Sequence, residues 1–324
     1  MRPGMLEDLE FDAQALMEAH PPVWRSPNKL VAFEIASPAG ADHEGRLHYS
    51  RWAAAEPPDV CNPTTATRLL EAREDVYDYR QALSGAVEWH VNFADPYLFV
   101  AYSTGLFAQD EMQVVEHPVL GALKEALEAG GHEARTVSGR DPTPILIMGA
   151  ERRCAVSTEP NAAMRRPAGL YGNRFAAAPS DVVRQAVRPI VPATVTNLVA
   201  IAAPGGGYGE YEGHEIRWIL RTAYTGFSAA RQLAGGRVAI HTGFWGCGAF
   251  GGNRRLMAML QLVAAQMAGI DLLVFHAFDA AGMRELAGAV EVLASRFGEG
   301  DMPTGDFIAA TRDLGIRWGT SDGN

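Results

Sequence analysis

The fold is decided by residues 242–253, which read Thr-Gly-Phe-Trp-Gly-Cys-Gly-Ala-Phe-Gly-Gly-Asn and follow the apolar run Arg237–His241. Glycines between a strand and a helix let backbone N–H groups approach an anion beside the positive N-terminus of the helix. The stretch therefore predicts a phosphate-binding loop. A tight structural turn, with Trp245 and Phe250 merely packing, is the alternative. The lysine of a P-loop and the Gly-x-Gly-x-x-Gly spacing are both missing, which disfavours an ATPase or an ordinary Rossmann enzyme.

Strands and helices alternate around this loop. Apolar runs that suit buried strands of a covered mixed or parallel sheet occur at Glu88–Ala94, Pro144–Gly149, Leu198–Ala203, Arg237–His241 and Asp271–Phe278. Two apolar stripes with helical spacing follow, from Leu256 to Met267 and from Met283 to Phe297. This pattern predicts an α/β fold with its site at the strand ends. Residues 157–179, rich in Pro, Arg and Ala, predict a surface loop.

The composition narrows the class of protein. The 324 residues are 48% hydrophobic and carry a net charge of −10, so we expect a globular protein without sequence-independent nucleic-acid binding. Three scattered cysteines and the absence of a basic, apolar leader predict a cytoplasmic protein without a zinc site, disulfide framework or membrane segment. The proline-punctuated N-terminal part predicts an irregular or helical accessory region over residues 1–80, ahead of one domain over residues 81–324.

The run from Trp245 to Gly252 resembles the Trp-Gly-Cys-Gly-Ala-Phe-Gly-Gly signature of the poly(ADP-ribose) glycohydrolases, which are macrodomain-related. Residues 223–227, the strand at 198–201, the Gly-x-Glu strand ending at Glu151 and the Phe-x-x-x-Asp from Phe275 to Asp279 are similar to further motifs of that family. The resemblance covers roughly residues 85–300. It implies a macrodomain-like mixed central sheet flanked by helices.

The same resemblance implies the site. The family's Phe-Ala-Asn motif corresponds to residues 93–95, and its Gln-Glu-Glu motif corresponds to Gln109-Asp110-Glu111. Glu111 would protonate the leaving group and then activate water, and Asp110 would hold ribose hydroxyls, because glycosidic cleavage needs a proton donor beside a cation-like ribosyl centre. A solvated acidic helix face is the alternative for these carboxylates. The implied substrate-binding residues are Asp95, Gln109, Thr242, Gly246, Cys247, Gly248, Ala249, Phe250, Gly251 and Phe275.

The sequence departs from the family at two places. Phe99, Val100 and Ala101 replace the Gly-Gly-Gly of the catalytic loop, and we expect their side chains to obstruct or reshape the ribose pocket. Arg152 and Arg153 follow Glu151 where the family has the tyrosines that sandwich adenine. They would meet a phosphate or be ordinary solvated charges.

These residues predict a glycoside hydrolase that cleaves the ribosyl bond of an ADP-ribose-containing compound without a metal or other cofactor. The expected partner is small-molecule or protein-linked ADP-ribose, in preference to long polymer, because a negatively charged chain repels a polyanion. A catalytically degenerate module that binds ADP-ribose or a nucleotide is the alternative, and a structural protein with an empty cleft is a further one.

Overall fold

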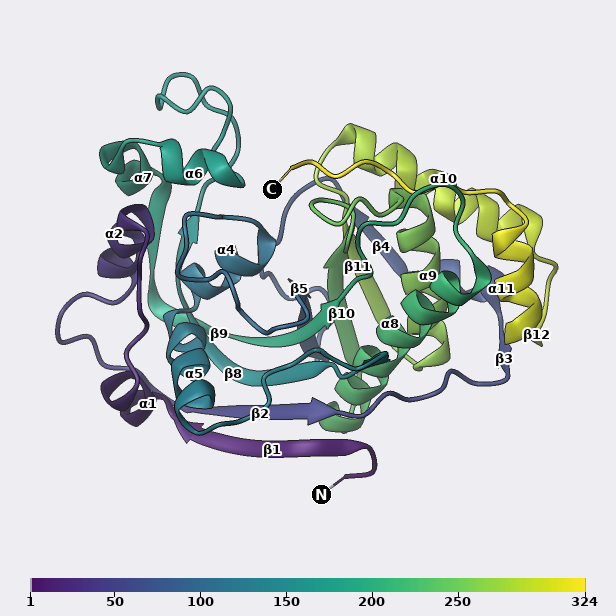
Figure 1. The fold of residues 1–324 in the computed structure, drawn as a ribbon, viewed down its shortest axis with the longest axis horizontal. Coiled ribbons are helices and arrows are strands. Elements are labelled where there is room, and N and C mark those ends of the chain that lie inside the picture. The colour runs from purple at the N-terminus through teal and green to yellow at the C-terminus, as the bar shows by residue number, and fades with distance from the viewer. Residues whose placement is uncertain (1, 324) are drawn as a thin grey trace.

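The computed structural model describes residues 2–323, and its centre is an eight-stranded mixed sheet with the order β1-β2-β8-β9-β5-β10-β11-β4 (Figure 1). In that order the strands are Met5–Asp12, Arg46–Trp52, Ile145–Val156, Val187–Ala202, Val87–Ala94, Val238–Gly243, Leu272–His276 and Leu70–Arg73. Neighbours from β1 to β9 pair antiparallel, and neighbours from β9 to β4 pair parallel. The sheet is therefore half antiparallel and half parallel.

Helices cover the sheet on both faces (Figure 1). Their bounds are α1 Ala13–Ala19, α2 Pro27–Ala36, α3 Pro63–Ala66, α4 Gln109–Glu116, α5 Pro118–Ala129, α6 Asn173–Ala177, α7 Ser180–Ala186, α8 Gly213–Ala234, α9 Arg254–Met267, α10 Ala280–Arg296 and α11 Thr304–Arg312, with a 3₁₀ turn at Thr67–Leu69. Two small two-stranded sheets pair β12 (Met302–Pro303) with β3 (Val60–Cys61) and β6 (Val137–Ser138) with β7 (Asp141–Pro142).

The central strand β9 shows why the sheet lies between two helical layers. Its side chains alternate, because successive residues of a strand point to opposite faces. Val199 and Ile201 join the core formed with α8, α9 and α10, whereas Leu198 and Ala200 join the core formed with α1, α4 and α5. A strand that is apolar on both faces is thus explained by helices on both sides.

The sequence predicted these central elements but not their full length. The central part of each expected apolar run forms a strand, and both amphipathic stripes form helices, α9 and α10. The strands β8 and β9 extend well beyond the expected runs and form a long antiparallel ribbon whose outer half is partly polar. Polar residues are compatible with a strand that has one solvated face, so an apolar run marks only the buried part of such a strand.

The N-terminal part differs from the expected irregular region. Residues 5–12 and 46–52 form β1 and β2, and residues 70–73 form β4, so this part supplies strands at both edges of the central sheet. Prolines at 21–22, 38 and 57–58 stand in the connections between elements, where the missing N–H costs no ladder hydrogen bond. Residues 157–172 form a loop without helix or strand, as expected for most of the 157–179 segment.

None of the helices within residues 2–323 combines the length and apolar character that a membrane-crossing helix needs.

Candidate active site

The site lies where the parallel half of the sheet opens. β5 and β10 pair only as far as His90 and His241, and beyond this point β5 continues alongside β9 alone. Gln109 covers the opened edge of β5: its Oε1 accepts from Phe93 N at 2.8 Å, and its Nε2 donates to Val91 O at 3.0 Å. The start of α4 is thereby fixed at the carboxyl ends of the parallel strands, the usual place for a site in an open α/β sheet.

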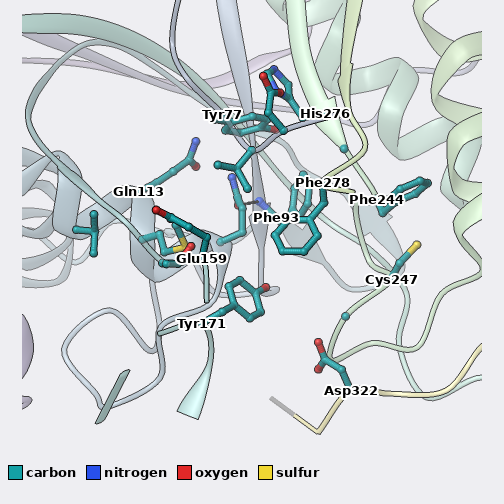
Figure 2. Close-up of a pocket in the computed structure, with 18 of the residues that line it drawn as sticks. Tyr77, Phe93, Gln113, Glu159, Tyr171, Phe244, Cys247, His276, Phe278 and Asp322 are labelled. Atoms are coloured by element: carbon teal, nitrogen blue, oxygen red, sulfur yellow. Dashed lines mark hydrogen bonds and ion pairs between the residues drawn. The ribbon is translucent and has the colours of Figure 1, made fainter. Parts of the chain in front are cut away.

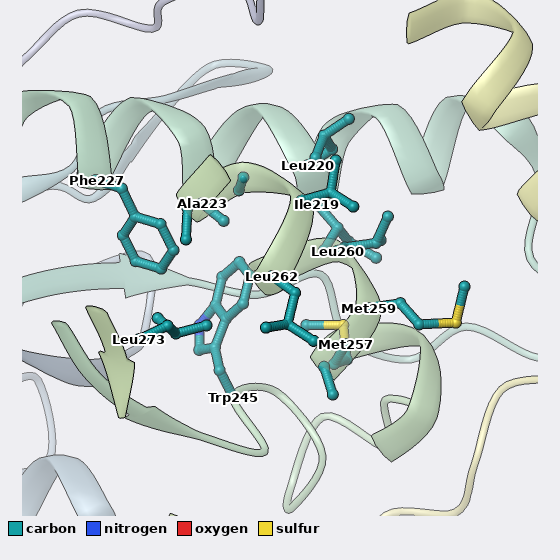
Figure 3. Close-up of a cluster of buried hydrophobic side chains, with 14 of the residues drawn as sticks. Ile219, Leu220, Ala223, Phe227, Trp245, Met257, Met259, Leu260, Leu262 and Leu273 are labelled. Carbon is teal, nitrogen blue, oxygen red and sulfur yellow. The ribbon is translucent and has the colours of Figure 1, made fainter. Parts of the chain in front are cut away.

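The glycine loop at the end of β10 is anchored by a buried indole. Trp245 is packed between the strands and helices α8 and α9, among side chains such as Ile219 and Leu262 (Figure 3), and its Nε1 donates to Ile201 O at 2.9 Å. Gly246 has a φ of +75°, and a Cβ there would lie 2.4 Å from the Cβ of Ala203. Only glycine fits at this position.

Three successive N–H groups of this loop are available to a ligand. The N–H groups of Cys247, Gly251 and Gly252 bond to carbonyls of the loop itself. Those of Gly248, Ala249 and Phe250 find no acceptor within residues 2–323, and the three residues line a cavity of about 150 Å³. Consecutive N–H groups without a partner can form an anion-binding nest, and the phosphate-binding role of this loop stays a prediction.

The two candidate catalytic carboxylates are in the same small cavity. Asp110 and Glu111 occupy the first turn of α4, are buried, and line this cavity with Asp95 and Gln109. Asp110 Oδ1 accepts from Asn92 Nδ2 at 2.8 Å, and Glu111 Oε2 accepts from Ala108 N at 3.0 Å. The structure therefore contradicts a solvated acidic helix face.

Burial changes the protonation of this pair. Loss of solvent raises the pKa of Asp110 well above its usual range, and the neighbouring Glu111 charge raises it further. Loss of solvent also raises the pKa of Glu111, against the opposing charge of Lys29. A raised pKa favours the protonated form of a carboxyl group, which is the form that a general acid needs.

A second, larger cavity of about 1350 Å³ adjoins the first, because Phe93, Gln109, Tyr171 and Gly248 border both. Aromatic side chains surround it, with Phe93, Tyr171, Phe244 and Phe278 visible in Figure 2. The exposed ring of Phe278 sits on a backbone with a φ of +71°, which is unfavourable for a bulky residue. The two spaces together can hold a ligand with a small buried end and a longer extended part.

The segment 319–323 crosses the glycine loop and also lines the large cavity. Asp322 N donates to Gly248 O at 3.3 Å, and Asp322 Oδ2 lies 3.1 Å from the position that a Cβ on Gly248 would take. Gly251 faces Ser321 N in the same way, at 3.1 Å from its Cβ position. A carboxylate therefore stands beside the anion-binding N–H groups, which the sequence analysis missed because no motif marks this segment.

A chain of hydrogen-bonded titratable groups starts at the large cavity, which Asp75 and His276 line, and continues through His241 to Glu88. His276 Nδ1 lies 2.7 Å from Asp75 Oδ1, its Nε2 lies 3.1 Å from His241 Nδ1, and His241 Nε2 lies 3.1 Å from Glu88 Oε2. Burial lowers the pKa of His276, so its ring is neutral near pH 7. Of the described residues, no three His, Cys, Asp or Glu are grouped as metal ligands would be.

Ten residues were expected to bind substrate, and the structure brings most of them together. Asp95, Gln109, Gly246, Gly248, Ala249 and Phe250 line the small cavity, and Cys247 lines the large one. Burial raises the pKa of the Cys247 thiol, which makes it a poor nucleophile.

Thr242, Phe275 and Gly251 are the exceptions. Thr242 is fully buried and donates to Gln261 Oε1 at 2.5 Å, and Phe275 is buried edge-on against Phe244, with ring centroids 5.0 Å apart. Gly251 is covered by residues 319–321. None of these three residues lines either cavity, so the structure does not support Thr242, Phe275 or Gly251 as ligand contacts. Strand and loop side chains alternate between core and cleft, and the motif alone does not say which way each one points.

Phe99 does not line the small cavity, contrary to the expectation that its side chain obstructs a ribose pocket there. Its side chain is fully buried in the core under α5, on a backbone with a φ of +53°. Val100, 52% exposed, and Ala101 line the small cavity instead. The turn thus keeps a conformation suited to glycine while its largest side chain points away from the site.

Arg152 is neither a free phosphate ligand nor a solvated charge. Its Nε donates to Glu116 Oε2 at 2.8 Å in a buried ion pair, and its guanidinium lies 4.0 Å above the ring of Tyr79. Glu151 of the Gly-x-Glu motif pairs with His43 at 2.9 Å and lies outside both cavities. Tyr77 and Tyr79, which line the large cavity, come from a segment that the sequence analysis did not single out.

Comparison with known proteins adds the family. Residues 145–285 match the family model "Poly (ADP-ribose) glycohydrolase (PARG), Macro domain fold". Over 71 residues the chain is 31% identical to "Probable poly(ADP-ribose) glycohydrolase 2" of Arabidopsis thaliana, an alignment that spans 22% of this chain and 13% of that protein.

Solved structures of poly(ADP-ribose) glycohydrolases are also among the matches. A Thermomonospora curvata poly(ADP-ribose) glycohydrolase bound to the inhibitor ADP-HPD is 16% identical, with 83% of this chain and 99% of that chain covered and a TM-score of 0.48. A Deinococcus radiodurans poly(ADP-ribose) glycohydrolase in complex with ADP-ribose is 14% identical, with 74% and 94% covered and a TM-score of 0.43. Residues 145–285, somewhat less than half of the chain, are thus similar to the poly(ADP-ribose) glycohydrolase family, whose model describes a macro domain fold.

Proposed function

We propose that this protein hydrolyses the ribosyl glycosidic bond of an ADP-ribose-containing compound. One observation carries the proposal: a buried pair of carboxyl groups, Asp110 and Glu111, lines the same cavity as Gly248, Ala249 and Phe250, whose N–H groups find no acceptor within residues 2–323. The first feature suits proton transfer to a glycosidic oxygen, and the second suits a diphosphate. The matching family model and the Arabidopsis relative, both of which carry the name poly(ADP-ribose) glycohydrolase, support the same reaction class.

In the proposed reaction, protonated Glu111 gives its proton to the leaving oxygen as the bond to the anomeric carbon breaks. The developing positive charge on the ribose faces the Asp110–Glu111 pair, which stabilises it electrostatically. The Glu111 carboxylate then takes a proton from the water that attacks the anomeric carbon, so the carboxyl group is regenerated. Asp110, held by Asn92, orients the ribose hydroxyls.

The extended part of the ligand would lie in the large cavity. The diphosphate would accept from the glycine loop, and the aromatic rings of Phe93, Tyr171 and Phe278 offer flat surfaces for the base. Five arginines and six carboxylates line this cavity, namely Arg152, Arg174, Arg188, Arg254, Arg284, Asp75, Asp78, Glu116, Glu159, Glu285 and Asp322. The charges that line the cavity therefore do not offset the net charge of −10, which repels a polyanion. We therefore propose a small or protein-linked substrate in preference to long polymer.

A cytoplasmic location belongs to the same proposal. The structure holds Cys61, Cys154 and Cys247 as free thiols, which suits a reducing compartment.

The experiment is a chromatographic assay of ADP-ribose released from a mono-ADP-ribosylated peptide, a short ADP-ribose oligomer and long polymer, with calorimetric binding of ADP-ribose in parallel. We expect release from the peptide or oligomer at a higher rate than from polymer. Tight ADP-ribose binding without release from any substrate would instead establish the binding module. Efficient degradation of long polymer would overturn the preference for a small substrate. If ADP-ribose is neither bound nor released, the protein is a structural one with an empty cleft.

A further inference from the structure

Lysine is nearly absent from this chain. Lys29 and Lys124 are its two lysines, whereas the other basic residues are arginines. Both lysines are buried, and Lys29 is completely inaccessible. Lys124 forms an ordinary i,i+4 ion pair with Glu128 at 2.8 Å. Lys29 has no ion pair within the described chain, so its buried charge needs another explanation.

The ammonium group of Lys29 is held under the turn that borders the small cavity. Lys29 lies near the start of α2, and its Nζ donates to Tyr102 O at 2.7 Å and to Ala101 O at 3.5 Å. Ala101 itself lines the cavity with Asp110 and Glu111, and α2 packs against α4. The ammonium group is thus held by carbonyls of the turn whose residue Ala101 lines the same cavity as the carboxyl pair.

The electrostatic coupling runs in both directions. Burial lowers the pKa of Lys29 to about 8, while the charges of Glu111 and Asp110 raise it. Lys29 in turn lowers the pKa of both carboxyl groups against the effect of burial. Asp95 from the turn after β5 adds a further negative charge, and the Tyr171 phenol, whose pKa burial raises to about 12, stays neutral. At the far end of α4, Glu116 is already compensated by Arg152.

We propose that Lys29 is a positioning residue that fixes the number of protons held by the Asp110–Glu111 pair. This inference rests on the proposed function of that pair. One buried positive charge compensates one carboxylate, so the neutral arrangement of the three groups keeps a single proton on the pair. That state supplies one proton donor and one ionised partner together, as the proposed reaction needs. A lysine fits because its compact ammonium bonds two carbonyls in a fully closed space, where a planar guanidinium would need more room.

Nuclear magnetic resonance of selectively ¹⁵N-labelled lysine tests the coupling without any turnover. Two lysines give two side-chain signals, and Lys124→Arg assigns them while keeping its ion pair with Glu128. The pH titration of the Lys29 signal is then compared between the wild type, Glu111→Gln, Asp110→Asn and the double variant. We expect the Lys29 pKa to stay near the wild-type value in each single variant, because the remaining carboxyl group still supplies one negative charge, and to fall in the double variant, which has none; the Lys124 signal stays unchanged throughout. A Lys29 pKa that falls in both single variants, or that does not fall in the double variant, would overturn the proposal.

Activity provides the second readout. In Lys29→Met the pair loses its compensating charge, so both limbs of the kcat/KM profile against pH move to higher pH, whereas Lys29→Arg keeps the charge and stays nearer the wild-type profile. A Lys29→Met variant with an unshifted profile and a merely lower rate would reduce Lys29 to a structural role. If Lys29→Met does not fold, the titration in the carboxyl variants decides alone. If no substrate is turned over, the proposed function fails. The coupling between Lys29 and the carboxyl pair is then decided by the resonance titration alone.

Discussion

Asn92 on β5 donates one Nδ2 to Asp110 Oδ1 at 2.8 Å and to Gln113 Oε1 at 2.9 Å, and this buried contact ties the sheet to the first turn of α4. The bond favours the ionised form of Asp110, but burial outweighs it and raises the pKa of this carboxyl group. The hydrogen bond from Asn92 therefore fixes the orientation of the Asp110 side chain, while burial makes the ionised form of that side chain unfavourable.

Asp110→Asn separates these two properties. The amide oxygen can still accept from Asn92, but the side chain no longer titrates. A group whose folded-state pKa is raised stabilises the fold below its unfolded pKa and loses that contribution as the pH rises through its folded pKa. We therefore expect the variant to gain stability over the wild type progressively as the pH increases from about 4, the unfolded pKa. Urea unfolding at several pH values measures this, and a difference that is independent of pH would contradict the burial argument.

Gly248 tests the anion-binding loop. Its φ lies outside the left-handed region, and the three atoms nearest to an added Cβ all belong to the exposed Asp322 side chain, so Gly248→Val should fold. A valine there blocks the approach to the N–H groups of the loop, whose charge-assisted bonds are worth ~1.5–3 kcal/mol each. We expect ADP-ribose affinity to fall by at least ~10-fold in calorimetry.

Gly236 provides the matched control, because a Cβ at that position meets nothing within 4 Å in the described structure. Gly236→Val should bind normally. Unchanged affinity of a folded Gly248→Val protein would show that the loop is structural. Gly251→Val is less informative, since the φ of +69° at Gly251 strains any side chain.

Shortening Val100 should change activity without changing stability, whereas shortening Phe99 should change stability without opening the site. Val100→Ala removes an exposed side chain from the wall of the small cavity, and we expect kcat/KM on an ADP-ribose oligomer to rise by a few-fold with unchanged stability. Phe99→Ala empties a fully buried position, which costs about 3–5 kcal/mol of folding free energy without opening the site. Activity and thermal unfolding measured together check both. A gain in oligomer turnover by Phe99→Ala would show that its ring does limit access.

Asp322 should weaken anion binding. Its carboxylate stands beside Gly248, so Asp322→Asn removes a like charge from the neighbourhood of a bound diphosphate. We expect ADP-ribose to bind about 3–10-fold more tightly, with a smaller gain at high salt because ions screen a partly exposed charge. Asp313→Asn, at an exposed pair with Arg312, is the control and should change nothing. Equal affinities for Asp322→Asn and the wild type at low salt would remove Asp322 from the site.

Much of this site was predictable from local sequence because its residues are close in the chain. The strand Val238–Gly243, the glycine loop and α9 follow one another, and spacing alone indicates the anion-binding turn. Gln109, Asp110 and Glu111 form one helical turn, so a three-residue motif places them together.

The remainder depends on contacts between distant segments. Lys29, Asn92 and Asp322 reach the site from three separate parts of the fold, and no local pattern signals such contacts. The rarity of lysine was a visible hint at position 29. The direction of the Phe99 side chain could not be read from the sequence either, since a phenylalanine with a φ of +53° requires a tertiary environment that holds it.

The most direct test compares Glu111→Gln with the wild type, by calorimetric binding of ADP-ribose and by turnover of whichever substrate the wild type hydrolyses. Because the Glu111 proton is transferred only in the transition state, we expect affinity to stay within a few-fold while kcat falls by ~10²–10⁴. Full turnover by a correctly folded Glu111→Gln protein would contradict the assignment of Glu111 as the proton donor.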